Sequence, residues 1–317
     1  MSEAAAPMPP RRPLRAMLER AEDGVLLVGI TPPRRSVPDA QAAQIAEVTL
    51  GRLATVDIDG LILYDIDDES DRNPQERPFP YLPTMDPAAF HRDHLGAFGK
   101  PVVIYRCVGK YTEPELADWL GGVDADRVLS VFVGASSRDK GVQTGLTQAY
   151  ALRGQVRPDL PLGAVAITER YTRSGDEHLR MLTKQERGAS FFVTQVVYDA
   201  DATKCLLSDY YYSCRQKDAA PRPVIFTLSV CGSAKTLEFL HWLGVDVPRW
   251  LENALRWSDD PLAESFEQCL STARDLAAFC RRLGVPFGFN VESVSIRKVE
   301  IEASIELARQ VRALLDA

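Results

Sequence analysis

Four polar side chains stand at or just beyond the ends of short apolar stretches in this sequence. Gln195 lies near the end of the β-branched and aromatic stretch 188–199, and Glu169, Glu292 and Asp65 follow other such stretches. An amide that is buried without partners costs roughly 1–3 kcal/mol, so Gln195 either bonds loop backbone or binds a ligand. A carboxyl group within hydrogen-bond reach of a substrate can deliver a proton to it. These residue types suit a site that holds a polar ligand and carries out proton transfer.

The elements that must position these side chains repeat along the chain. Apolar strands that alternate with helices imply parallel pairing and right-handed crossovers, and eight such units in 317 residues predict a (β/α)8 TIM barrel. A doubly wound open sheet is the alternative, but no G-x-G-x-x-G follows the first strand. The segment 168–171 is expected as a loop at the end of the fifth strand. The strands are expected at 24–30, 61–64, 101–105, 128–133, 163–167, 188–199, 223–228 and 287–291.

Composition bounds the class of protein. The barrel is expected to fill 21–317 as one domain, after an Ala/Pro-rich tail over 1–20 that is disordered or partly helical. The net charge of −7 argues against a nucleic-acid binder or a binder of anionic membranes. Six scattered cysteines without a C-x-x-C pair, and no apolar run near the roughly 20 residues of a membrane span, indicate a soluble cytoplasmic protein. The sequence is compatible with a homo-oligomer.

Six segments, in order along the chain, match motifs of one enzyme family. They are TPP at 31–33 (family E-x-x-P-P), IYRC at 104–107 (H-L-T-C), ITERY at 167–171 (Y-P-E-x-H), LRMLTKQERG at 179–188 (L-x-x-L-K-x-K-x-x-A-G), FVTQVVYD at 192–199 (I-T-Q-x-F-F-D) and GVDVPRW at 244–250 (V-x-I-P-x-W). Through them the chain resembles the methylenetetrahydrofolate reductase family over nearly all of 24–317.

The resemblance implies reduction of 5,10-methylenetetrahydrofolate to 5-methyltetrahydrofolate, with NADH or NADPH as electron source and FAD as the family's flavin. It implies a reduced folate bound by Gln195, Tyr198, Asp65 and Arg297. It implies cofactor contacts by Lys184, Glu177, Tyr171, Arg170, Ala135 and Ser136. No metal is expected, because the acidic segment 65–71 lacks regular ligand spacing.

The chain departs from the family at the flavin. The family's flavin-side aspartate falls on Ala135, and its Tyr and His fall on Ile167 and Tyr171. Losing one charged hydrogen bond costs about 1.5–3 kcal/mol, so we expect FAD to bind weakly or not at all. A flavin-independent branch of the family exists, and this chain is compatible with that mode.

The family's first-strand glutamate falls on Gly29, so another carboxyl must deliver the proton. We expect Glu292 in this role, ahead of Glu169 and then Asp65, because the eighth strand of a closed barrel pairs with the first. Gly29 itself would leave room for the longer side chain. The alternative for Glu292 is to cap the last helix or to pair with Arg297.

Two other functions fit the same residues. One is a related barrel that keeps the pterin site but acts on a different redox substrate. The other is a barrel without catalysis that binds a folate or a partner subunit. Oxidation of NADH or NADPH that depends on methylenetetrahydrofolate would separate an enzyme from a binder.

Overall fold

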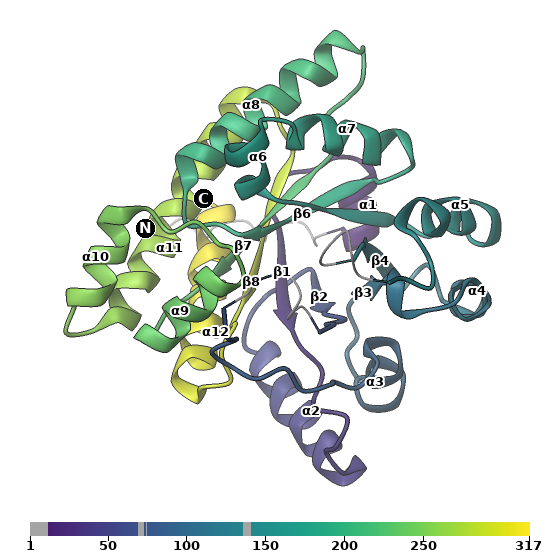
Figure 1. The fold of residues 1–317 in the computed structure, drawn as a ribbon, viewed down its shortest axis with the longest axis horizontal. Coiled ribbons are helices and arrows are strands. Elements are labelled where there is room, and N and C mark those ends of the chain that lie inside the picture. The colour runs from purple at the N-terminus through teal and green to yellow at the C-terminus, as the bar shows by residue number, and fades with distance from the viewer. Residues whose placement is uncertain (1–11, 69–72, 74, 136–140) are drawn as a thin grey trace, which may run out of the picture.

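Eight parallel strands form a closed barrel, which confirms the predicted fold (Figure 1). The computed structural model describes residues 12–68, 73, 75–135 and 141–317. Each strand pairs with the next along the chain, and β8 pairs with β1. The strands are β1 (Val25–Ile30), β2 (Gly60–Leu63), β3 (Val102–Cys107), β4 (Val128–Val133), β5 (Leu162–Ala166), β6 (Phe191–Val196), β7 (Val224–Ser229) and β8 (Phe287–Glu292).

Helices follow the strands and lie around the barrel (Figure 1). A capping box begins α4, where Thr112 Oγ1 accepts a hydrogen bond from Glu115 N and the Glu115 carboxylate accepts one from Thr112 N. The helices are α1 (Leu14–Glu19), α2 (Asp39–Leu53), α3 (Pro87–His94), α4 (Glu113–Gly122), α5 (Leu146–Val156), α6 (Thr168–Ser174), α7 (Glu177–Glu186), α8 (Ala200–Gln216), α9 (Ala234–Trp242), α10 (Arg249–Trp257), α11 (Pro261–Leu283) and α12 (Lys298–Leu315).

The expected loop at 168–171 is wrong, because these residues form the first turn of α6. The helix ends at Gly175, which adopts the left-handed conformation with φ +72°. Glycine takes that conformation without strain and commonly ends helices. A short additional helix, α6, therefore precedes α7 after the fifth strand.

The barrel interior is filled by inward-facing side chains and is closed at one end by α1. Leu14, Met17 and Leu18 of α1 belong to the same buried cluster as Val25 and other inward residues of the strands. Leu14 also lies against Gly60, at the N-terminal end of β2. The part of the tail that was expected to be partly helical thus contains α1, which packs against the barrel interior. The first 11 residues of the expected tail lie outside the described residues.

A long loop joins β2 to α3 and contacts α9, the helix that follows β7. The Trp242 Nε1–H donates to the Gln75 carbonyl at 3.0 Å, and Asn73 Nδ2 donates to the Trp242 carbonyl at 3.3 Å. The guanidinium of Arg77 lies 5.1 Å from the Trp242 ring centroid, a cation–π distance. Because β1 and β8 separate β2 from β7 in the barrel, this contact links loops on either side of those two strands.

A buried ion pair connects the last helix to the first two strands. Arg312 of α12 donates from Nη1 to Asp59 Oδ2 at 3.2 Å and from Nη2 to the Gly24 carbonyl at 2.8 Å. Asp59, just before β2, also accepts a hydrogen bond from Leu26 N at 2.7 Å. Both charged side chains are buried. The ion pair holds the C-terminal helix against the site of barrel closure.

Replacement of Arg312 by leucine should strongly destabilise the fold. The substitution leaves the buried carboxylate of Asp59 without its guanidinium, and breaking a buried pair in this way costs about 3–5 kcal/mol. The unfolding free energy from urea titration measures the loss. The matched control is Arg92→Leu, whose partner Asp93 is the next residue on α3 and is exposed, and whose pair is worth about 1 kcal/mol at most. Equal losses in the two variants would contradict this role.

Candidate functional site

The C-terminal mouth of the barrel carries a group of polar side chains from β2, β7 and β8. Side chains alternate between the two faces of a strand, and inward residues include Leu27 of β1, Ile62 of β2 and Ile225 of β7. The next inward positions toward the mouth are therefore Gly29, Tyr64 and Thr227. The same alternation on β8 brings Asn290 and Glu292 inward. Glu292 is the registered neighbour of Gly29 across the β1–β8 pairing, as barrel closure predicted.

Asn290 connects the members of this group, which we call the mouth cluster (Tyr64, Thr227, Asn290 and Glu292). Its Nδ2 donates to Tyr64 Oη at 2.9 Å, to Thr227 Oγ1 at 3.3 Å and to Glu292 Oε2 at 3.3 Å. The Tyr64 ring packs edge-on against Tyr105, with 4.8 Å between ring centroids. The cluster therefore combines an aromatic wall with several hydrogen-bonding groups.

The absence of a side chain at Gly29 serves Tyr64. A Cβ atom at this position would lie 2.8 Å from Tyr64 Cε2 and 3.1 Å from Asn290 Oδ1. These contacts are too short for a real methyl group. The expectation that Gly29 leaves its space to Glu292 is thus wrong in its detail, since the tyrosine ring and the Asn290 amide take that space.

Glu292 has the properties of a proton donor near neutral pH. Burial raises the pKa of Glu292 to about 6, although hydrogen bonds from Tyr64 and Asn290 lower it in part. Its side chain remains partly exposed at the end of β8. Burial and the neighbouring Glu292 charge raise the pKa of Tyr64 well above its ordinary value. The pair can share a proton at the mouth. Glu292 does not pair with Arg297 or cap α12.

Glu169, the second carboxyl candidate, is enclosed in the first turn of α6. Its Oε1 accepts a hydrogen bond from Asp246 N at 3.3 Å, and its buried Oε2 has no partner among the described residues. Burial raises its pKa to about 7. The side chain lines a cavity of about 10 Å³ together with Tyr198 and Thr203. That volume holds about one water molecule, so this cavity is too small for a substrate at Glu169.

Asp65, the third carboxyl candidate, is the centre of a hydrogen-bond network after β2. It accepts hydrogen bonds from Cys107 N at 2.9 Å, from Lys110 Nζ at 2.5 Å and from Tyr111 Oη at 2.8 Å. The side chain is buried. These contacts fix Asp65 as an internal partner that holds the ends of β2 and β3 together.

Gln195 and Tyr198 lie at and just beyond the end of β6. The β6–β7 register shifts between Val193 and Val196, and such irregularities re-aim side chains. The half-buried Gln195 donates from Nε2 to the Leu243 carbonyl at 3.1 Å. This is the first of the two alternatives from the sequence, a hydrogen bond between the amide and loop backbone. Tyr198 is buried and donates from its hydroxyl to the Ser229 carbonyl at 2.7 Å. Its hydroxyl is therefore used within the protein.

Lys184 and Glu177, two of the expected cofactor contacts, pair with each other. Lys184 Nζ donates to the Val165 carbonyl at 2.6 Å and to Glu177 Oε1 at 3.3 Å. Burial lowers the pKa of Lys184. Glu177 is fully buried and also accepts a hydrogen bond from Ile167 N at 3.2 Å. The pair anchors α7 to β5.

The remaining expected cofactor contacts do not converge on one pocket. The Tyr171 hydroxyl donates to Asp209 Oδ2 at 2.7 Å, and this bond raises its pKa to about 12. Arg170 is exposed on α6, and Ala135 is exposed after β4. Ser136 lies outside the described residues.

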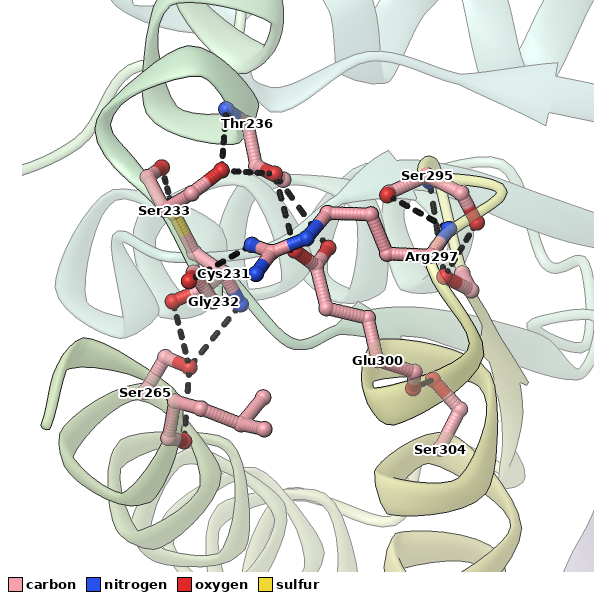
Figure 2. Close-up of polar contacts among 11 residues, drawn as sticks. Cys231, Gly232, Ser233, Thr236, Ser265, Ser295, Arg297, Glu300 and Ser304 are labelled. Carbon is pink, nitrogen blue, oxygen red and sulfur yellow. Dashed lines mark hydrogen bonds and ion pairs between the residues drawn. The ribbon is translucent and has the colours of Figure 1, made fainter.

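Arg297 binds a buried carboxylate near the start of α9, as Figure 2 shows. Its Nη1 donates to the Gly232 carbonyl and to Glu300 Oε1, both at 2.9 Å. The Thr236 hydroxyl donates to Glu300 at 3.1 Å. Glu300 is fully buried, and a Cβ at Gly232 would lie 2.8 Å from its Cγ. An internal anion therefore occupies the region after β7 and β8 where many TIM barrels bind phosphate.

Sequence reasoning missed Tyr64, Asn290 and Glu300. Asn290 had a usable signal, since it is a polar residue inside the apolar run of the last strand. Within the described residues, no group of three His, Cys, Asp or Glu is placed to hold a metal. Glu69 and Asp71 of the acidic segment lie outside them. No described helix is long and apolar enough to cross a membrane.

Comparison with known proteins gives a strong match among the solved structures. No family model matches the chain, and no curated protein does. An uncharacterized protein from Clostridium thermocellum, whose solved structure binds two copies of 5-methyl-5,6,7,8-tetrahydrofolic acid, is 42% identical, with a TM-score of 0.84 over 95% of this chain and 99% of that chain. The expected membership of the methylenetetrahydrofolate reductase family stays a prediction.

Two dihydropteroate synthases match far more weakly. The enzyme from Vibrio fischeri is 11% identical, with a TM-score of 0.45 over 93% of this chain and 94% of that chain. The enzyme from Xanthomonas albilineans is 12% identical, with a TM-score of 0.47 over 92% and 94%.

Removal of the Glu292 carboxyl should change how stability depends on pH. The pKa of this group rises from 4.5 to about 6 on folding, so the folded state holds the proton more tightly. The contribution of Glu292 to the free energy of unfolding is therefore present below pH 4.5 and is lost as the pH rises through 6. Relative to Glu292→Gln, the wild type should therefore lose about 1–2 kcal/mol across this window, measured by urea denaturation.

The matched control for this measurement is Glu306→Gln on α12. Hydrogen bonds from Gln310 and Arg309 lower the pKa of Glu306, so its pH dependence should have the opposite sign. A difference between wild type and Glu292→Gln that stays constant from pH 4.5 to 7 would contradict the raised pKa.

Proposed function

Because this chain belongs to the same family as the Clostridium thermocellum protein, we propose that it binds a reduced folate at the C-terminal mouth of its barrel. The observation that carries the proposal is the ligand of that relative, 5-methyltetrahydrofolate, together with 42% identity over nearly the whole of both chains. Since that protein binds two copies, we propose that this chain also binds two.

The mouth cluster, together with Gln195 at the end of β6, suits the polar edge of a pterin. This ring system presents amino and ring N–H groups as donors and an oxo group as acceptor. Glu292 supplies a carboxylate for the donors, while the Tyr64 hydroxyl and the amide of Gln195 supply both donors and acceptors. Tyr105 adds an aromatic surface beside Tyr64. The half-buried Gln195 and the partly exposed Glu292 are accessible at this end of the barrel.

A second candidate function is catalysis on the bound folate, favoured by the raised pKa of Glu292. In that case the protein is a divergent oxidoreductase that reduces 5,10-methylenetetrahydrofolate to 5-methyltetrahydrofolate with NADH or NADPH. Opening of the methylene bridge requires a proton, and Glu292 would deliver it from the end of β8. A general acid in this position contributes about 10²–10⁴ in rate.

The groups that the resemblance assigns to the flavin do not fit FAD well. Lys184 is committed to Glu177 and to backbone, so it is not available to a cofactor phosphate. The Glu300 carboxylate already accepts from Arg297 and from the Thr236 hydroxyl near the start of α9, so these donors are not free for a phosphate. We propose that folate binding does not require FAD.

Two alternatives remain within the same proposal. A related barrel could bind the folate while it acts on a different redox substrate. A barrel without catalysis would bind the folate only, as a carrier or as a subunit of a complex. Each alternative keeps the mouth cluster as the binding site and differs in what the site does to its ligand.

Gln195→Leu should weaken binding of 5-methyltetrahydrofolate at the mouth. The leucine cannot form the amide's hydrogen bonds with the ligand, and losing one or two of them costs about tenfold in affinity. Isothermal titration calorimetry measures the change. The matched control is Gln185→Leu, since Gln185 also donates to a loop carbonyl, that of Ala220, at 2.9 Å but on α7. Unchanged affinity in a folded Gln195→Leu protein would exclude this residue from the site.

If the protein is a reductase, Glu292→Gln should lower turnover by about 10²–10⁴ while the folate still binds. The assay follows oxidation of NADH or NADPH in the presence of 5,10-methylenetetrahydrofolate, with and without added FAD. Glu169→Gln is the matched control and should retain most activity. Loss of activity in Glu169→Gln alone would identify the other carboxyl as the acid. Folate binding without any turnover would favour the non-catalytic alternative.

A further inference from the structure

A second hollow, of about 270 Å³, lies outside the barrel between α3 and α4. On β3, Tyr105 belongs to the barrel interior, so the next residue, Arg106, points outward. The hollow is lined by Asp86, Arg106, Tyr111, Glu115, Leu116 and Trp119. Its volume is slightly below the about 300–1,000 Å³ of an ordinary ligand pocket. It has room for a bicyclic ring but not for a whole folate.

Arg106 is buried in the wall of this hollow with part of its hydrogen-bonding capacity unused. Only 3% of the residue is exposed. Its Nη1 binds Asp86 and donates to Tyr111 Oη at 3.0 Å. Its buried Nε has no partner in the described part of the chain, and no described residue accepts a hydrogen bond from its Nη2. A buried donor without an acceptor costs about 1–3 kcal/mol, which a ligand would recover.

The geometry of a guanidinium decides what this ligand must offer. Nε–H and Nη2–H lie side by side in one plane and donate in parallel to one or two acceptors. Aromatic and apolar surfaces are close by, since the guanidinium lies 4.3 Å from the Trp119 ring centroid and the buried Leu116 also lines the hollow. A planar ligand with an acceptor on its edge satisfies both features.

The charges around the hollow favour a neutral ligand over an anion. Asp86 already neutralises Arg106 through their ion pair. Glu115 adds a negative charge at the rim, where Thr112 holds its carboxylate with two hydrogen bonds of 2.8 Å. A ligand carboxylate would be repelled by both acids. Amino and ring N–H groups, in contrast, can donate to them.

We propose that this hollow binds the pterin ring of a second reduced folate, an assignment that rests on the proposed function. The oxo group of the ring accepts from the free edge of Arg106, its amino and N–H groups face the carboxylates of Asp86 and Glu115, and its flat surface packs on Trp119 and Leu116. The benzoylglutamate portion extends into solvent.

The experiment titrates the protein with 5-methyltetrahydrofolate and, separately, with the two halves of the folate. These are 6-methyl-5,6,7,8-tetrahydropterin and N-(4-aminobenzoyl)-L-glutamate. The wild type should bind two equivalents of the whole folate. Arg106→Lys keeps the charge that pairs with Asp86 but loses the planar edge, and it should weaken one of the two sites by at least about tenfold. Trp119→Leu should weaken the same site.

The matched control is Arg153→Lys, since Arg153 is a half-buried arginine of α5 that donates to the Leu160 carbonyl away from the hollow. It should keep both equivalents. Thermal unfolding checks that each variant is folded. If Arg106→Lys does not fold, Trp119→Leu tests whether the hollow is the second site. The tetrahydropterin should lose one binding site in both hollow variants, while the benzoylglutamate half should show no binding that depends on Arg106.

The two proposals fail separately. If folded Arg106→Lys and Trp119→Leu proteins keep two equivalents at wild-type affinity, the hollow is not the second site. If the benzoylglutamate half binds in an Arg106-dependent way and the tetrahydropterin does not, the assignment of the ring is overturned. If Arg106→Lys removes one binding equivalent while Gln195→Leu leaves the affinity of both equivalents unchanged, the hollow is supported as a folate site. That result would also overturn the role of Gln195 at the mouth.

Discussion

The pairing of β8 with β1 is the contact on which the rest of the molecule depends. It joins the two ends of the sheet over five registered positions, from Val25–Gly288 to Gly29–Glu292. A closed sheet has no free edge, and closure fixes which strand ends become neighbours at the mouth. Closure also brings the N-terminal ends of the strands together at the opposite end of the barrel. There, Asp59 and Arg312 hold the last helix against the first two strands.

Closure explains the composition of the mouth cluster. Once Glu292 is the neighbour of Gly29, the side chains of β2 and β8 must share the space above the first strand. Tyr64 and Asn290 occupy it, and their hydrogen bond leaves no room for a side chain at Gly29. The same packing shields Glu292 enough to raise its pKa. One backbone constraint thus produces both the glycine and the protonatable carboxyl.

The sequence predicted those parts of the structure that depend on periodicity and strand order. The alternation of apolar runs predicted the barrel, and the circular strand order predicted that Glu292 lies beside Gly29. The partners of long polar side chains could not be predicted in the same way. Lys184 reaches back to the Val165 carbonyl of β5, and Arg297 reaches the Gly232 carbonyl after β7. Such contacts depend on how elements that are distant in the sequence pack together, which leaves no periodic pattern in the sequence.

The helix α1 gives the N-terminal segment a larger part in the protein than its Ala/Pro-rich start suggests. Leu14, Met17 and Leu18 complete an apolar floor whose other members are strand residues such as Leu27. A chain cut at residue 21 would present that floor to water, and an exposed apolar surface promotes aggregation. Proteases that reach the segment before Val25 could therefore inactivate the barrel without touching a strand or the ligand-binding end.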